Sequence, residues 1–170
     1  MSEKGDANSG YRPEFVAALQ LFARVSEAMY GRGLQRPILV GGAAAEFWSL
    51  SAVTTGDFDI CTTRQSELEE EMKRAGLVRP SGAGAMLKGW IHPELRLGFE
   101  VVAEVPMDGN IEPARLRLIR PIGEAALFRV ICVEDLRRPH GPVRLAQRAG
   151  PHRSGADTAI PSPRCGSGLS

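Results

Sequence analysis

The 170-residue chain lacks several features that would assign it to a common class. Its three cysteines are widely spaced and include no Cys-x-x-Cys pair, so nothing indicates a disulfide framework or a cysteine-ligated zinc site. No apolar run approaches the roughly 20 residues that a membrane-spanning helix needs, and the N-terminus has no apolar signal-peptide core. The net charge is only +1, so no overall field draws the protein toward nucleic acid or membrane. We therefore expect a cytoplasmic protein with no membrane partner.

What remains is the composition of an ordinary globular domain. Apolar residues make up 43% of the chain and charged residues 24%, and the length is enough for one domain with a hydrophobic core. Since the net charge is close to zero, an anionic substrate has to be held locally, by a metal ion or a few placed groups. Cys61 and Cys132 lie in apolar, strand-like runs, and we expect both to be small core residues.

Composition divides the chain into three segments. Residues 1–10 are polar and contain glycine, which predicts a disordered N-terminus, and residues 11–136 carry helix and strand patterns. Residues 137–170 have no aromatic residue, no lysine and a single acid, Asp157, which predicts a disordered tail rich in Arg, Pro, Gly and Ser. The arginines of this tail could instead form a nucleic-acid-binding arm, although no aromatic residues lie between them. The tail also resembles an out-of-frame reading of a GC-rich gene, so a frameshift is one hypothesis for it.

The periodicity of residues 11–136 predicts an α+β fold. Apolar residues recur at three- and four-residue steps from Phe15 to Met29, which indicates a helix that ends at Gly31 and Gly33. Two more helices are predicted over residues 43–50 and 64–75, the second with a solvated acidic run at residues 69–71. Strands are predicted over residues 38–40, 57–60, 87–92, 97–102, 116–119 and 127–133. We therefore expect a mixed β-sheet flanked by helices.

The stretch from Ile38 to Cys61 carries the candidate chemistry. It reads as a short strand, the pair Gly41-Gly42, a short helix, a polar loop and a second strand with Asp57 and Asp59. Successive strand residues point to opposite faces, so both carboxylates project from one face while the apolar residues between and after them enter the core. Carboxylates two residues apart on a strand are about 6–7 Å apart, close enough to bracket a divalent cation.

Two further features strengthen this interpretation. Gly41 and Gly42 lie where strand becomes helix, and without Cβ atoms they let a phosphate approach the backbone N–H groups of a helix N-terminus. Glu100 lies on a later strand between apolar residues, a costly position for a carboxylate unless it faces a metal or a partner. Three acids on adjacent strands beside a glycine turn predict a two-cation site. Alternatively, Glu100 forms an ion pair with Arg96 or Arg117.

These motifs resemble those of a known superfamily. Val40-Gly41-Gly42, the short helix and Thr54-Thr55-Gly56-Asp57-Phe58-Asp59-Ile60 resemble the Gly-Gly/Ser and Asp-x-Asp signature of the DNA polymerase β-like nucleotidyltransferases. The resemblance is nearest to the small prokaryotic minimal nucleotidyltransferases, which include abortive-infection type toxins, and it covers about residues 34–136. Glu100 matches the third acid of that group, and Glu134-Asp135-Leu136 matches the segment that opens its last helix.

The resemblance implies transfer of a nucleoside monophosphate from an NTP to an acceptor, with release of pyrophosphate. Asp57, Asp59 and Glu100 would hold two Mg²⁺ ions as the catalytic triad, and Gly41, Gly42 and Thr55 would contact the nucleotide. The acceptor, whether RNA, a protein or a small molecule, is left open. The alternative is a catalytically impaired member that acts by binding, as a toxin–antitoxin component or a homo-oligomer.

The chain departs from the pattern of that group at three places. Gly42 replaces the serine of many members, and Glu100 is longer than the usual aspartate. The segment 137–142, Arg-Arg-Pro-His-Gly-Pro, interrupts the helix that relatives continue after Glu-Asp-Leu.

Several other residues carry a specific expectation. Glu46 is expected to face solvent or to cap its helix, and Phe47 and Trp48 to lie in the core. Thr55 is expected to order the loop before Asp57 through its hydroxyl. His92 is more simply a turn or surface residue than a base, and Lys88 a solvated charge.

Overall fold

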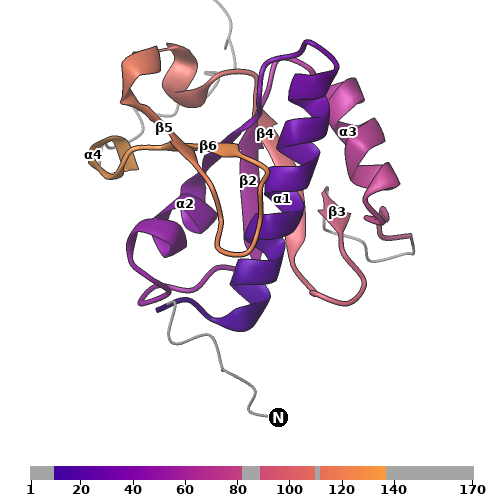
Figure 1. Ribbon diagram of the computed structural model, residues 1–170, viewed down its shortest axis with the longest axis horizontal. Helices are drawn as coiled ribbons and strands as arrows, with labels where there is room; N and C mark the ends of the chain where they lie inside the picture. The colour runs from indigo at the N-terminus through magenta and orange to yellow at the C-terminus, as the bar shows by residue number, and fades with distance from the viewer. Residues whose placement is uncertain (1–9, 82–88, 110–111, 137–170) are drawn as a thin grey trace, which may run out of the picture. The chain divides into compact units, whose positions relative to one another are not determined.

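The computed structural model describes residues 10–81, 89–109 and 112–136. The segments predicted to be disordered lie outside these ranges, apart from Gly10. Within them the chain has the expected α+β fold, a six-stranded mixed sheet flanked by helices (Figure 1). The elements follow in the order α1 (Pro13–Gly31), β1 (Ile38–Val40), α2 (Gly41–Trp48), β2 (Asp57–Cys61), α3 (Gln65–Arg74), β3 (Trp90–Ile91), β4 (Gly98–Ala103), η1 (Pro106–Gly109), η2 (Pro113–Arg115), β5 (Leu116–Ile119), β6 (Phe128–Ile131) and α4 (Val133–Leu136).

The sheet places β1 and β2 at its centre. Its strand order is β3-β4-β2-β1-β6-β5. β2 runs antiparallel to β1 and parallel to β4, and β1 runs parallel to β6, while the outer strands β3 and β5 pair antiparallel with their neighbours. The strand that carries the two aspartates therefore has a hydrogen-bonded neighbour on both sides, which fixes its register.

One face of the sheet packs against α1, with α3 beside that helix (Figure 1). Phe58 and Ile60 of β2 have no exposed surface. The ring of Phe58 lies 5.5 Å from that of Phe15 and 6.3 Å from that of Phe22, measured between centroids. Because residues of a strand alternate between faces, this packing turns Asp57 and Asp59 to the opposite face.

Most predicted elements are confirmed, and the differences have local causes. The strand predicted over residues 87–92 is described only at Trp90–Ile91, and its first two residues lie outside the described ranges. The predicted strand 127–133 is shorter because the Leu127 amide leaves the sheet and bonds to Glu27 of α1 at 3.1 Å. At its other end the chain turns into α4, where the Asp135 amide bonds to the Cys132 carbonyl at 3.2 Å.

Two expectations about side chains have clear outcomes. Cys61 and Cys132 are buried, as predicted. The acidic run at residues 69–71 was predicted to be solvated, and this is wrong for Glu71. Glu71 is 7% exposed because it forms ion pairs with Arg32, directly after α1, at 2.8 Å and with Arg74. Among the described helices, none is both long and apolar enough to cross a bilayer.

Candidate functional site

The sheet brings the three predicted acids onto one face. Asp59 is the register partner of Glu100 in the parallel β2–β4 pair and of Val40 in the antiparallel β1–β2 pair. Register partners in a sheet project to the same side, so Glu100 lies beside Asp59. Asp57, two residues before Asp59 in β2, projects to that side as well. Val40 is the last residue before the Gly41-Gly42 turn. The acids and the glycine turn, predicted as separate motifs, are therefore neighbours across two strand pairs.

Each aspartate lies over a glycine. A Cβ atom at Gly41 would overlap the carboxylate of Asp59, and one at Gly98 would overlap Oδ1 of Asp57. Gly41 also has φ +59°, in the left-handed region that favours glycine, so both its conformation and its surroundings require this residue. Gly98 was not among the predicted site residues. The sequence does contain a relevant feature, because Gly98 lies two residues before Glu100. That spacing becomes informative only when β4 is known to pair with β2, where it places Gly98 opposite Asp57.

The charge of Asp59 is affected by both burial and neighbours. Burial raises the pKa of its carboxyl, and repulsion from Asp57 and Glu100 raises the pKa further. The backbone N–H of Gly42, in the first turn of α2, donates a hydrogen bond to the Asp59 carboxylate and opposes this rise. A divalent cation between the acids would remove the mutual repulsion. The donor set fits such an ion, because Mg²⁺ prefers carboxylate oxygens, although in the described ranges no three acidic, His or Cys groups form a ready metal cluster.

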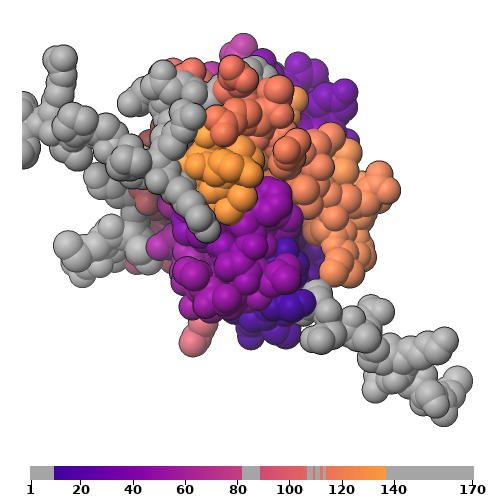
Figure 2. Space-filling view, turned by 90° about the vertical axis from the view of Figure 1, so that its left-hand side faces the viewer, coloured from indigo at the N-terminus to yellow at the C-terminus, as the bar shows by residue number. Residues whose placement is uncertain are grey.

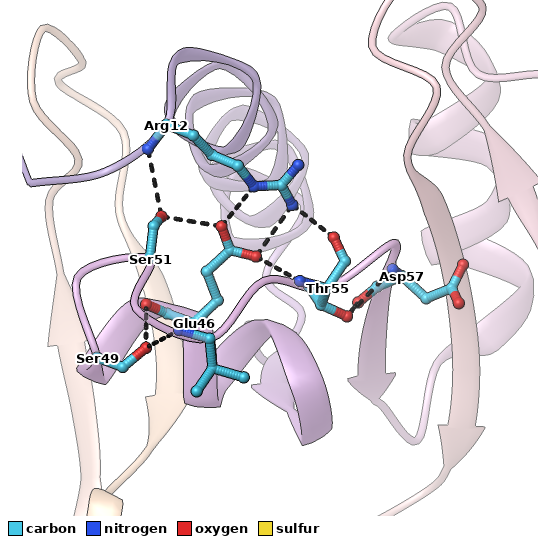
Figure 3. A network of polar contacts seen from close by, with 7 residues as sticks. Arg12, Glu46, Ser49, Ser51, Thr55 and Asp57 are labelled. Carbon is cyan, nitrogen blue, oxygen red and sulfur yellow. Dashed lines mark hydrogen bonds and ion pairs between the residues drawn. The ribbon is translucent and has the colours of Figure 1, made fainter.

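The prediction that Glu46 faces solvent or caps its helix is wrong. Its side chain is fully buried, at 0% exposure, and forms an ion pair with Arg12 (Figure 3). Arg12 donates from Nε at 2.6 Å and from Nη2 at 3.0 Å, the Ser51 hydroxyl donates at 2.9 Å, and the Thr55 amide donates at 2.7 Å. The physical reason for the burial is that the loop after α2 folds back over Glu46 and supplies these donors. Arg12, 34 residues away, was not predicted.

The loop between α2 and β2 is held in an unusual conformation. Leu50 and Ser51 have φ of +52° and +61°, which is uncommon for residues other than glycine. Thr55 ends the loop and confirms the prediction for its hydroxyl, which donates to the Asp57 carbonyl at 3.1 Å and accepts from the Asp57 amide at 3.3 Å. A Cβ atom at Gly42 would lie 2.6 Å from this hydroxyl. Gly42 therefore leaves room for Thr55 as well as donating to Asp59.

A pocket of about 520 Å³ opens beside Asp59. It is lined by Val40, Gly41, Gly42, Ala45, Asp59, Cys61, Val102, Ala103, Val105, Pro106, Ile131, Asp135 and Leu136. Among the described residues the walls are mainly aliphatic, the charged lining groups are the carboxylates of Asp59 and Asp135, and none is a lysine or an arginine. Burial, and then the nearby Asp59, raise the pKa of the Cys61 thiol to about 11. This thiol is therefore neutral near pH 7 and is not an activated nucleophile.

The helix α4 contributes Asp135 and Leu136 to the lining of the pocket and packs beside α2 (Figure 2). Asp135 is 2% exposed, accepts a hydrogen bond from the Cys132 thiol at 3.0 Å and forms an ion pair with Arg115 at 3.1 Å. The Trp48 indole N–H donates to the Ile131 carbonyl at 2.8 Å, which ties α2 to β6. These contacts hold α4 and α2, which both line the pocket, in place.

The remaining predictions are resolved in part. The alternative ion pair of Glu100 with Arg117 is wrong, because β4 and β5 are separated by three strands. Glu100 forms no ion pair with Arg96 either, within the described ranges. His92 directly precedes the turn at residues 93–95, and its carbonyl accepts from the Arg96 amide at 3.1 Å. Lys88 lies outside the described residues. Phe47 and Trp48 are partly buried and pack against the core.

Comparisons of the chain with protein-family models, with curated proteins and with solved structures return no match. The arrangement of the acids, the glycine turn and the pocket is therefore the basis on which a function is assigned.

Proposed function

We propose that the protein is a Mg²⁺-dependent nucleotidyltransferase that transfers a nucleoside monophosphate from an NTP to an acceptor. The observation that carries this proposal is the register of β2, which places Asp59 beside Glu100 on one side and beside the strand that ends at Gly41-Gly42 on the other. This register supports the proposal because phosphoryl transfer needs carboxylates for metal ions next to backbone groups that accept phosphate.

The acids have a defined part in this proposal. Asp57, Asp59 and Glu100 would hold two Mg²⁺ ions, which neutralise charge on the phosphates and favour ionisation of the acceptor hydroxyl. Their oxygen donors suit Mg²⁺, and a cation between them would offset the repulsion from Asp57 and Glu100 that helps to raise the pKa of Asp59. Asp57 is exposed, whereas Asp59 and Glu100 are half-buried, so the acids are accessible from one open side.

The glycine turn and the pocket divide the remaining tasks. Gly41 and Gly42 allow close approach to the N-terminus of α2, where the helix dipole favours an anionic group. The pocket beside them is mainly aliphatic, and its described lining residues include no cation, so this part of the wall suits the uncharged nucleoside of a substrate better than its phosphates. Phosphates near Asp59 would instead depend on the metal ions for charge compensation.

Isothermal titration of the protein with an NTP, with and without Mg²⁺, tests the proposal. We expect binding that requires Mg²⁺ and is abolished when Asp57 and Asp59 are both replaced by alanine. Glu70→Ala is the control, since Glu70 is an exposed acid of α3 whose side chain is 55% exposed in a surface ion pair with Arg32. Equal binding by the double variant and the wild-type protein would overturn the proposal.

A second candidate is a binding role for the same fold, as a homo-oligomer or as one partner of a toxin–antitoxin pair. It is supported by two large apolar residues that border the pocket and are exposed, Val102 at 50% and Val105 at 43%. Light scattering, which measures the mass of the particle in solution, tests the homo-oligomer form of this second candidate. A monomer that still binds NTP in the presence of Mg²⁺ would count against the homo-oligomer.

A further inference from the structure

We infer that Arg12 and Glu46 are positioning residues for the candidate site, which they serve by fixing the loop that leads into Asp57. The loop comprises residues 49–56, between the end of α2 and the start of β2. This inference rests on the proposed function, because it concerns the placement of the same carboxylates. It assigns a role to two residues that touch none of the three acids directly.

The buried carboxylate of Glu46 accepts hydrogen bonds at both of its oxygens. Oε1 accepts from Arg12 and Ser51, and Oε2 accepts from Arg12 and Thr55. The side chain is fully buried, so these four donors replace the water it would otherwise bind. Two of the four come from the loop, and a buried ion pair of this kind is weak evidence for stability alone.

A chain of hydrogen bonds leads from Glu46 through Thr55 to Asp57. The Thr55 amide donates to Glu46, and its carbonyl accepts from Nη2 of Arg12 (Figure 3). Both backbone polar groups of Thr55 are therefore held by one ion pair. The Thr55 hydroxyl is bonded in turn to the amide and the carbonyl of Asp57. A shift of the ion pair would pass through Thr55 to the first residue of β2.

Ser51 holds the other end of the loop. The Ser51 hydroxyl donates to Glu46 and accepts from the Arg12 amide at 3.2 Å, and Ser51 is one of the two loop residues with positive φ. Arg12 immediately precedes α1, so the helix that covers the opposite face of the sheet also sets the loop. The network thus joins α1, α2 and β2 at the entrance to the site.

A matched control exists elsewhere in the chain. Arg36 and Glu27 form a second bidentate ion pair, at 2.7 and 3.1 Å, and Glu27 also accepts a backbone amide, that of Leu127. Its contacts involve α1, the segment before β1 and the segment before β6, not the loop before Asp57. Glu46→Gln and Glu27→Gln therefore make the same chemical change in two bidentate ion pairs, of which only the first leads to the acids. In the first pair the glutamate is the buried partner, and in the second the arginine is.

The experiment compares the full chain with these two variants by two measurements. Mn²⁺ binding is followed by electron paramagnetic resonance, and amide hydrogen exchange is followed by NMR at Thr55 and Asp57. For E46Q we expect about 10-fold weaker Mn²⁺ binding, a size typical of the loss of an outer-shell contact, and faster exchange at both amides. For E27Q we expect wild-type Mn²⁺ affinity and wild-type exchange at Thr55 and Asp57, even where its thermal stability falls.

The outcomes separate this inference from the proposed function. Wild-type Mn²⁺ affinity and unchanged exchange in E46Q would overturn the inference while leaving the function intact, as would equal losses of Mn²⁺ affinity in E46Q and E27Q. Absence of Mn²⁺ binding by the wild-type protein would overturn the proposed function and, with it, the positioning role. If E46Q does not fold, Ser51→Ala replaces it, since that change removes only the hydroxyl, and we expect the same two effects at smaller size.

Discussion

The carboxylate of Asp59 occupies the space into which a side chain at Gly41 would project. Asp59 lies on β2, and Gly41 begins α2 directly after β1, the neighbouring strand. The two residues are 18 positions apart in the sequence, yet neither can change without affecting the other. This contact joins the acid-bearing strand to the start of α2.

Replacing Gly41 with alanine tests that contact. The left-handed φ of +59° costs an alanine about 1–2 kcal/mol, and the added Cβ displaces Asp59. We expect G41A to unfold at lower urea concentration and to bind Mg²⁺ and NTP more weakly than the wild-type protein. Gly31→Ala is the control, because nothing lies within 4 Å of a Cβ built there. Equal stability and equal binding of G41A and G31A would contradict the assignment.

The Glu46 ion pair predicts how stability depends on pH. Burial alone raises the pKa of Glu46, but hydrogen bonds from Arg12, the Thr55 amide and Ser51 outweigh it, and the pKa lies below its usual value. The folded pKa is thus below the unfolded value of about 4.3, so the stabilisation is present above that pH and is lost as the pH falls through the folded pKa. Urea unfolding at a series of pH values should show wild type and E46Q converging in acid. A difference that stays constant would contradict this account.

Phe58, between the two aspartates, has a purely structural role. It has no exposed surface and contacts the rings of Phe15, Phe22 and Phe99. Phe58→Ala should lower the free energy of unfolding by about 3–5 kcal/mol, as is usual for a buried ring. Chemical denaturation measures the loss. A change below about 1 kcal/mol would show that β2 does not pack against α1 as described.

Cys61 lines the pocket but should take no part in the chemistry. Because the pKa of its thiol is raised to about 11, it should react slowly with iodoacetamide at pH 8 in the folded protein and rapidly in urea. Mass spectrometry of the peptide that contains Cys61 measures both rates. Cys61→Ala alters the pocket wall but should leave the requirement of NTP binding for Mg²⁺ unchanged. Loss of that requirement would show that the thiol helps to hold the metal ion.

The sequence predicts the acid face for a simple reason. The period-two pattern of Asp57-Phe58-Asp59-Ile60 assigns the faces of β2 without knowledge of its neighbours, and Glu100 beside the apolar Phe99 does the same for β4. Short-range patterns of this kind determine both the helices and the strands that frame the site.

The pairing of distant residues could not be predicted in the same way. Gly98 acquires its role only from the register of β4 against β2, and Arg12 meets Glu46 only after α1, α2 and the loop have packed. A lone glutamate on a short helix has no local feature that distinguishes a buried ion pair from a solvated charge. Glu71 was misassigned for the same reason, since its partner Arg32 lies at the end of another helix.

The central claim is that the glycine turn and the three acids form one site for a metal-bound nucleotide. NMR of the amides of Gly41, Gly42 and Asp59 during titration with Mg²⁺ and a non-hydrolysable NTP tests it most directly. We predict that the three resonances shift together with one midpoint, only when Mg²⁺ is present, and that Glu100→Gln weakens the response of all three. Shifts confined to other parts of the chain, or a response that is the same without Mg²⁺, would contradict the account.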